Sequence, residues 1–219
     1  MHVLFYTIRF TISSKIACIM SYRQLTFSDH AAMTQVLAQS FEEDPLISYI
    51  LPNQKTRVKT VAKFFRAMGK LAIRNGFAFG VSEPLEGVAF WNFPNKSMSA
   101  SPKDLLMFLP LLFSYYPIGA QRARAVFRQT EVNHKKYASE PHFYLDNLGV
   151  LASARGKGLS SKLIRPFLEM ADEQKVIAYT DTVTKSNVPF YEHFGFECVE
   201  ESFIQETGIT VYALKRPIQ

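Results

Sequence analysis

The sequence predicts one mixed α/β (α+β) domain, in which strands alternate with helices. The first observation is a strand, a glycine-rich loop and a helix in succession between His142 and Phe167. The second is another strand followed by a short helix between Ile177 and Phe196. The third is size: 219 residues, of which 47% are hydrophobic, are enough for a single domain with a full core.

Residues 1–20 are the odd segment of the chain. Val3 to Ile12 is apolar, but Arg9 and Lys15 break the segment into pieces shorter than the ~20 apolar residues of a membrane helix. It also lacks the ordered regions of a signal peptide. We expect an N-terminal extension over residues 1–20, which either comes from an extended start site and is not native or adds a strand. A single domain is then expected over residues 21–219.

Three helical segments are predicted in the first third of the chain. Asp29 can cap a helix with apolar residues at helical spacing, namely Ala32, Met33, Val36, Leu37 and Phe41. A short apolar turn follows from Leu46 to Leu51. Arg57 to Arg74 is amphipathic, and Asn75-Gly76 closes this helix. Its inward residues are predicted to be Val58, Val61, Phe64, Phe65, Met68, Leu71 and Ala72.

Two strands of a hairpin are predicted at 77–82 and 87–93, and a last strand at 208–215, because branched and aromatic residues are frequent there. Trp91, the only tryptophan, has two interpretations, as a core residue or as a wall of the substrate site.

A helical region is predicted from Ser101 to about Tyr137. Its first half, Leu105 to Tyr116, is apolar nearly all round and is interrupted by Pro110 and followed by Pro117. This segment is interpreted as a lid over an acceptor pocket, as core or as a dimer face.

The loop at 155–158 has the composition of an anion site. It joins the strand His142 to Val150 to a helix whose buried face is marked by Leu159, Leu163 and Phe167, and whose interior Pro166 predicts a kink. Glycines let backbone N–H groups turn toward one point, and the helix adds its unpaired N–H groups and the positive end of its dipole. The pattern predicts a phosphate or pyrophosphate at the start of the helix.

The loop does not fit the two common phosphate motifs. A P-loop needs Gly-Lys-Ser/Thr, whereas Gly156-Lys157 is followed by Gly158. A dinucleotide fingerprint needs a third glycine where Ser161 stands. The run Arg155, Gly158 and Ser160 fits Arg-x-x-Gly-x-Gly/Ala better, with serine in place of the usual glycine or alanine. It resembles the acetyl-CoA loop of the GNAT superfamily of N-acetyltransferases.

A second segment strengthens this resemblance. After the strand Ile177 to Thr182, the chain carries Asn187, then Pro-Phe-Tyr ending at Tyr191, then Phe-Gly-Phe, which is similar to a GNAT pattern. Ser186 or Asn187 can cap a short helix here, proline is tolerated in its first turn, and Gly195 can end it.

The chain from about Ser21 to Pro217 resembles the puromycin N-acetyltransferase-like branch of this superfamily. The matching features are residues 38–45, Glu140-Pro141, Leu148-Gly149-Val150, Asn187 to Tyr191 and Lys215-Arg216-Pro217. The resemblance implies the GNAT fold, a twisted mixed sheet of about seven strands flanked by helices. It also implies that the glycine-loop strand and the next strand splay apart to admit acetyl-CoA.

The resemblance implies the residues of a donor site. Backbone groups of Leu148 and Val150 would pair with the pantetheine arm, and N–H groups of the loop would hold the pyrophosphate. The expected cofactor-binding residues are Leu148, Gly149, Val150, Arg155, Gly156, Lys157, Gly158, Leu159, Ser160 and Asn187.

The expected reaction is direct acetyl transfer to an amine, in which orientation and charge stabilisation do most of the work. Tyr191 is the candidate general acid, provided that the pocket lowers its pKa or a water shares the proton. Asp146 is the candidate base, since alternation would place it on the side of Leu148 and Val150. Glu43, Asp44 or a chain of waters are the alternatives.

The predicted acceptor is a small-molecule amine. Alternatives are an acetyl-CoA sensor or partner protein without turnover, and a protein or peptide N-acetyltransferase. The net charge of +6 is interpreted either as an unspecialised surface or as steering of polyanionic coenzyme A. No basic stripe interleaved with aromatic residues indicates nucleic acid, and we expect no membrane partner.

Cysteine and histidine usage predicts no metal site and no disulfide framework. Cys18 and Cys198 are the only cysteines, and the five histidines are scattered. We therefore expect a cytoplasmic protein with reduced thiols, without metal and either a monomer or a homodimer.

Overall fold

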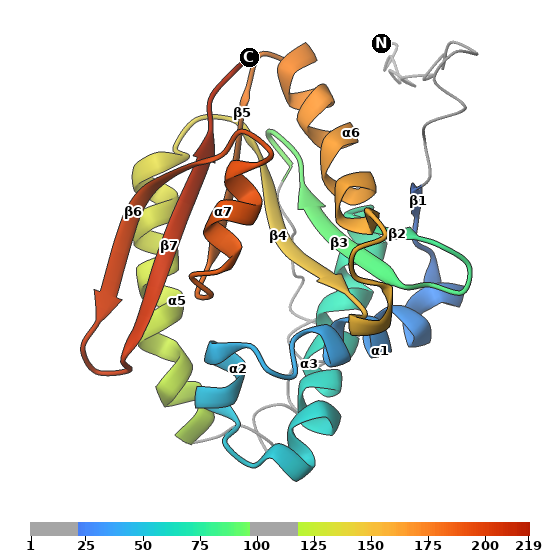
Figure 1. Cartoon of the computed structure of the whole chain (residues 1–219), viewed down its shortest axis with the longest axis vertical. Helices are drawn as coiled ribbons and strands as arrows, with labels where there is room; N and C mark the ends of the chain where they lie inside the picture. The colour runs from blue at the N-terminus through green and yellow to red at the C-terminus, as the bar shows by residue number, and fades with distance from the viewer. Residues whose placement is uncertain (1–21, 97–117) are drawn as a thin grey trace, which may run out of the picture.

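A computed structural model of the chain describes residues 22–96 and 118–219. The predictions for residues 1–20 and for the apolar segment 105–116 lie outside the described residues. The described part forms one seven-stranded sheet with helices on both faces (Figure 1). The predicted mixed sheet of about seven strands flanked by helices is confirmed.

The strands follow the order β1-β2-β3-β4-β5-β7-β6 across the sheet. Their bounds are β1 Tyr22–Gln24, β2 Ala78–Val81, β3 Gly87–Asn92, β4 His142–Val150, β5 Ile177–Thr182, β6 Glu197–Ile204 and β7 Ile209–Arg216. Only β4 and β5 pair in parallel; the other neighbours are antiparallel. The hairpin β2–β3 and the last strand lie where the sequence predicts them.

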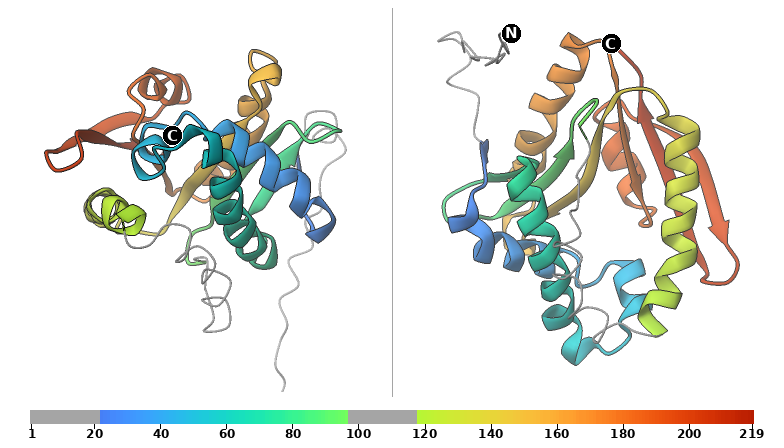
Figure 2. Two further views of the ribbon diagram at one scale, coloured as in Figure 1. Left: turned by 90° about the horizontal axis from the view of Figure 1, so that it is seen from below. Right: turned by 180° about the vertical axis from the view of Figure 1, so that it is seen from behind.

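The helices form two layers (Figure 2). Their bounds are α1 His30–Ser40, α2 Pro45–Ile50, α3 Gln54–Asn75, α5 Ile118–Tyr137, α6 Leu159–Glu173 and α7 Asn187–Glu192, with short 3-10 turns η1 Phe27–Asp29 and η2 Ala152–Ala154. Helices α1, α3 and α5 lie on one face of the sheet and α6 and α7 on the other. In the described part of the chain, no helix is long and apolar enough to cross a membrane.

Local signals explain the ends of α3. Asn53 accepts a hydrogen bond from Lys55 N at the start, and Gly76 adopts a left-handed conformation (φ 78°) at the end. The predicted role of Asp29 at α1 is wrong in one respect. Asp29 is the residue before the helix, but its carboxylate binds Arg23 and the backbone of Thr26 and makes no cap bond to α1.

The core lies on both faces of the sheet. One cluster joins α6 and α7 to the strands and contains Trp91, which is fully buried, stacks on Phe167 and donates its Nε1–H to Leu163 O at 2.9 Å. Trp91 is therefore a core residue and does not line the cavity described below. A second cluster joins α1 and α3 to the sheet. Ala32, one of the apolar residues at helical spacing in α1, is exposed and does not belong to this core.

Helix α6 is continuous through Pro166, so the proline does not end it. Its predicted buried residues Leu159, Leu163 and Phe167 are all buried. The helix therefore presents its first turn to the glycine loop from a fixed position on the sheet.

Candidate active site

The parallel strands β4 and β5 separate halfway along their length. Their pairing runs from His142↔Ile177 to Leu145↔Thr180, although β4 continues to Val150. The Thr180 hydroxyl donates to Leu145 O at 2.9 Å at this last rung. Beyond it, the edge of β4 that faces β5 pairs with no strand within residues 22–96 and 118–219. The predicted splay in the sheet is confirmed.

The free edge of β4 carries the backbone groups of Leu148 and Val150. On its other side, β4 pairs with β3, and Leu151 N donates to Glu86 O at 2.9 Å. Because hydrogen-bonded and non-bonded pairs alternate in an antiparallel ladder, Gly149 points its backbone groups toward β3. Leu148 and Val150 therefore point their N–H and C=O groups toward the opening.

The glycine loop lies directly after this edge. Gly156 (φ 78°) and Gly158 (φ 72°) are both left-handed, and a Cβ atom placed on either would meet no protein atom within 4 Å. Their backbones are thus reachable from outside. Helix α6 begins at Leu159, and the N–H groups of a first helical turn lack acceptors within the helix. Arg155 and Lys157 are exposed beside the loop, and Lys157 Nζ lies 3.4 Å from Glu86 Oε1.

A β-bulge changes the expected direction of Asp146. Phe90 pairs with Asn147 and Trp91 with Leu145, so Asp146 has no partner on β3. A bulge interrupts the alternation of side chains. Asp146 lies beside Asn147, whose Nδ2 donates to Asp146 Oδ2 at 2.9 Å. Leu148, in contrast, packs against the core cluster of α6. The prediction that alternation places Asp146 on the side of Leu148 and Val150 is therefore wrong.

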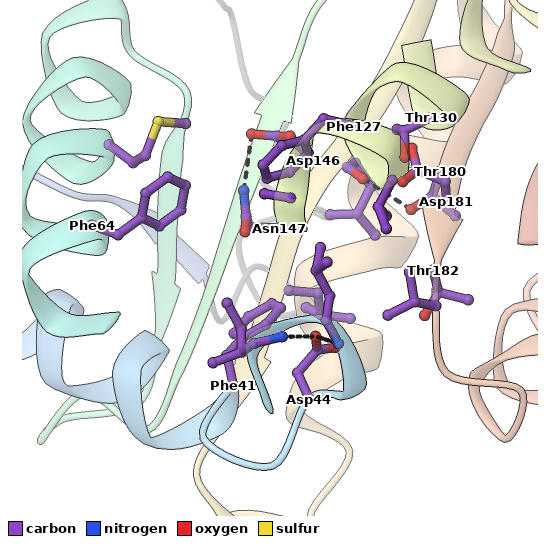
Figure 3. A pocket seen from close by; sticks show the side chains of 18 of the residues that line it. Phe41, Asp44, Phe64, Phe127, Thr130, Asp146, Asn147, Thr180, Asp181 and Thr182 are labelled. Atoms are coloured by element: carbon purple, nitrogen blue, oxygen red, sulfur yellow. Dashed lines mark hydrogen bonds between the residues drawn. The ribbon is translucent and has the colours of Figure 1, made fainter. Parts of the chain in front are cut away.

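A cavity of about 520 Å³ fills the opening between the strands (Figure 3). Most of its wall is apolar and comes from the end of α1, from α2, α3 and α5, and from the inner strands. Its apolar lining residues are Phe41, Leu46, Ile47, Ile50, Phe64, Phe65, Met68, Ala123, Val126, Phe127, Leu145, Leu148 and Val183. Its polar residues are Asp44, Thr130, Tyr144, Asp146, Asn147, Thr180, Asp181, Thr182, Asn187 and Tyr191. The volume is ordinary for a small-molecule site.

Helix α7 brings two predicted residues to the cavity. Asn187 and Tyr191 are one turn apart and both line it. Asn187 Nδ2 donates to Thr182 Oγ1 at 3.2 Å, which joins α7 to the end of β5. Ser186 precedes the helix but makes no side-chain cap bond, and Gly195 is left-handed (φ 84°) after it.

The cavity raises the pKa of Tyr191. Burial of the phenol raises this pKa to about 12, the nearby carboxylate of Asp181 adds to the increase, and a hydrogen bond with Thr180 opposes it. A phenol of this pKa gives its proton to a thiolate with difficulty, since a thiol has a pKa near ~8.5. Of the two conditions for Tyr191 as a general acid, the lowered pKa is therefore not present, and a water that shares the proton stays a prediction.

Two carboxylates, Asp146 and Asp181, line the cavity where the strands separate. Burial raises the pKa of Asp146 to about 6, against hydrogen bonds from Asn147 and Tyr144. Burial also raises the pKa of Asp181 to about 7, with a further increase from the charge of Asp146. Asp181 was missed in the sequence. Its position in the sequence could have indicated it, because Asp181 lies near the end of the predicted strand Ile177 to Thr182, where the two strands are expected to splay apart.

The other two candidate bases are placed differently. Asp44 lines the cavity, but its Oδ1 accepts hydrogen bonds from Leu46 N and Ile47 N and so caps α2. Glu43 is exposed, lies 3.8 Å from Arg57 and is outside the cavity lining. Among residues 22–96 and 118–219, no group of three or more histidine, cysteine or acidic side chains is arranged to hold a metal.

Comparisons with known proteins agree with this geometry. Residues 130–215 match the family model of the acetyltransferase (GNAT) domain. An uncharacterized N-acetyltransferase of Schizosaccharomyces pombe is 25% identical over 185 residues, which cover 81% of this chain and 74% of that protein. These findings support the GNAT superfamily and identify the chain as an acyltransferase.

Two solved structures share the fold. A Corynebacterium glutamicum protein described as histone acetyltransferase HPA2 and related acetyltransferase has a TM-score of 0.62 at 19% identity, covering 91% of this chain and 96% of its own. Arylalkylamine N-acetyltransferase 2 of Aedes aegypti has a TM-score of 0.59 at 14% identity, covering 90% and 98%. At such low identities the similarity concerns the fold alone.

Proposed function

We propose that this GNAT-type acyltransferase is an N-acetyltransferase that uses acetyl-CoA as the donor and a small-molecule primary amine as the acceptor. The observation that carries the proposal is the opening between β4 and β5. It combines a free backbone edge at Leu148 and Val150, a glycine loop at the end of that edge and an apolar cavity with polar side chains at its centre.

The residues at the opening fit the donor. An extended pantetheine arm can add to the free edge of β4 like another strand, through Leu148 and Val150 with Gly149 between them. The loop from Arg155 to Ser160 would hold the pyrophosphate through its N–H groups, because both glycines leave the space above their backbone open. Gly156, Lys157, Gly158 and Leu159 would belong to this cradle, and Asn187 lines the cavity. Acetyl-CoA supplies an activated thioester, whose carbonyl carbon receives the amine.

The side chains of the cavity would orient the amine and handle its protons. Asp146 and Asp181 have raised pKa values near neutrality, which suits a group that receives a proton from an ammonium ion. Tyr191 keeps its proton, because its pKa is about 12. We therefore infer that Tyr191 donates a hydrogen bond to the leaving sulfur and does not transfer its proton completely.

The small size of the acceptor is supported by the cavity and by the neighbours. A site that is walled by α2, α3 and α5 suits a compact molecule. The Aedes aegypti enzyme acts, by its name, on arylalkylamines. The narrower resemblance to the puromycin branch stays a prediction, and puromycin belongs among the compounds to be tested.

Binding and turnover can be tested separately. We expect calorimetric titration of the full chain with acetyl-CoA to give saturable binding. We expect release of free thiol from acetyl-CoA when small amines are added, followed with a thiol reagent. Aromatic and aliphatic amines, puromycin, aminoglycosides and a peptide with a free N-terminus form the panel. Absence of binding at millimolar acetyl-CoA would refute the proposal. Binding without thiol release for any amine would favour a sensor protein instead.

A further inference from the structure

The acceptor end of the cavity carries two carboxylates on neighbouring strands. Asp146 is the bulged residue of β4, and Asp181 is the first residue of β5 beyond the last rung of pairing. Tyr144 Oη donates to Asp181 Oδ2 at 3.1 Å, and Asn147 Nδ2 donates to Asp146 Oδ2 at 2.9 Å (Figure 3). A carboxylate accepts about four hydrogen bonds, so each of these groups keeps acceptor positions for a ligand.

The charge of this pair is not balanced within the described part of the chain. The ion pairs there involve other carboxylates, namely Asp29, Glu43, Glu83, Glu86, Glu131, Asp172 and Glu200. Burying two uncompensated carboxylates is unfavourable, which is why their pKa values rise to about 6 and about 7. A cation with several N–H donors bound between them would remove this penalty, and an alkylammonium ion offers both.

The cavity wall on the side of α3 favours an apolar body. Phe41, Phe64, Phe65, Met68 and Phe127 line it from the end of α1, from α3 and from α5. These side chains offer no hydrogen-bond partner to a second polar end of a ligand, and they can contact a ring or a branched alkyl group.

The third carboxylate of the cavity is already engaged. Asp44 Oδ1 accepts from two backbone N–H groups, Leu46 N at 2.9 Å and Ile47 N at 3.1 Å, in the first turn of α2. These bonds fix its orientation and compensate part of its charge. A second ammonium group would therefore find a weaker site than the first.

We propose that the acceptor is a monoamine with an apolar body of about the size of an aromatic ring, and that its ammonium group binds between Asp181 and Asp146. Asp181 is then a specificity-determining residue. This inference rests on the proposed function. It goes further by stating which end of the cavity binds the amine nitrogen of the acceptor and which amines the cavity excludes.

The test is equilibrium binding of amines to the full chain saturated with coenzyme A, which cannot react. Three probes are compared: phenethylamine, phenethyl alcohol, which lacks the charge, and putrescine, which has two charges and no ring. We expect phenethylamine to bind about 10- to 100-fold more tightly than either of the others.

Variants locate the binding. We expect Asp181→Asn, which keeps the size and removes the charge, to weaken phenethylamine binding about 10- to 100-fold while coenzyme A affinity stays within about 3-fold. Asp146→Asn should act in the same direction. Glu131→Gln is the matched control, since it removes one exposed negative charge from α5, and Glu131 is not among the residues that line the cavity. It should leave amine binding unchanged.

The outcomes separate the two proposals. If acetyl-CoA does not bind, the proposed function fails. Two results would refute only the present inference, provided that acetyl-CoA binds. In the first, putrescine or phenethyl alcohol binds as tightly as phenethylamine. In the second, Asp181→Asn binds phenethylamine as tightly as the natural chain does. A circular dichroism spectrum and unchanged coenzyme A affinity establish that each variant is folded.

Discussion

Tyr144 on β4 donates a hydrogen bond of 3.1 Å to Asp181 on β5, at the point where these two strands stop pairing. Burial and the nearby carboxylates raise the pKa of Tyr144, so its hydroxyl remains a donor throughout the neutral range. The bond ties a carboxylate of the proposed acceptor site to the strand that carries the proposed donor site. It also lowers the pKa of Asp181, which burial raises.

Removal of this bond should move the acid limb of the pH profile. In Tyr144→Phe, the pKa of Asp181 should rise above its value of about 7, because the hydrogen bond that lowers it is gone. If the ionised carboxylate holds the amine, kcat/KM falls as pH decreases through this pKa, and the fall begins at higher pH in the variant. The measurement is kcat/KM for the amine between pH 5.5 and 9, with constant saturation by acetyl-CoA.

Tyr137→Phe is the control for this profile. It removes another tyrosine–carboxylate bond, from Tyr137 Oη to Glu200 at 2.6 Å, which lies outside the cavity. Its profile should match that of the natural chain. An unshifted profile for Tyr144→Phe would show that Asp181 does not govern the acid limb.

Tyr191→Phe should reduce turnover without loss of donor binding. General acid catalysis by full proton transfer accelerates a reaction by about 10²- to 10⁴-fold, and a hydroxyl that only donates a hydrogen bond accelerates it less. We therefore expect kcat to fall by about 10- to 100-fold in this variant. Acetyl-CoA affinity should stay within about 3-fold, because the lost group is at the reacting end. Tyr179→Phe is the control: its buried hydroxyl has no hydrogen-bond partner among the described residues and lies outside the cavity lining. Full activity of Tyr191→Phe would assign Tyr191 a packing role.

Gly158→Ala should weaken acetyl-CoA binding more than a glycine-to-alanine change that causes the same backbone strain elsewhere in the chain. A left-handed residue with a side chain is strained by about 1–2 kcal/mol, and the new methyl group would stand in the proposed pyrophosphate cradle. Gly208→Ala imposes similar strain, since Gly208 has φ 68° and open space around it in the turn between β6 and β7. We expect both variants to melt at a lower temperature, and only Gly158→Ala to lose acetyl-CoA affinity, by at least about 10-fold. Equal affinities in the two variants would place the pyrophosphate elsewhere.

Trp91→Phe tests the core interpretation of the tryptophan. The variant loses a buried hydrogen bond of 2.9 Å to Leu163 O and part of the volume that stacks on Phe167. The free energy of unfolding should decrease by about 1–3 kcal/mol, measured by urea denaturation. KM for the amine should not change, because Trp91 is absent from the cavity wall. A changed KM with unchanged stability would restore the substrate-wall interpretation.

The sequence predicts this site as far as its signals are local. The glycine loop, the strand His142–Val150 and the helix that begins at Leu159 are encoded by neighbouring residues, and the structure has them at the predicted places. The same holds for β5, whose predicted bounds are those observed. Left-handed glycines and helices with apolar residues at helical spacing can be predicted from neighbouring residues alone, without the contacts that distant residues make.

Features that depend on a partner strand were missed. The bulge at Asp146 arises from its register with Phe90 and Trp91, more than fifty residues earlier, so alternation within β4 gave the wrong side for this carboxylate. Asp181 is an ordinary strand residue until β4 brings Tyr144 and Asp146 against it. Asp29 shows the same effect on a smaller scale, since Arg23 takes the carboxylate that could have capped α1.

The unpaired residue in β4 has a consequence for how this chain tolerates insertions and deletions. Because of it, the two halves of β4 have separate registers. His142 to Leu145 pairs with β5, and Asn147 to Val150 pairs with residues 87–90 of β3. Leu145 and Leu148 both pack against the core cluster of α6, although they are three residues apart in the sequence. Deletion of Asp146 would place them two residues apart, which is the spacing of side chains on one face of a regular strand. Asn147 and Leu145 would then pair with Phe90 and Trp91 without a bulge. The sheet should therefore tolerate the loss of this residue better than the insertion of another one beside it.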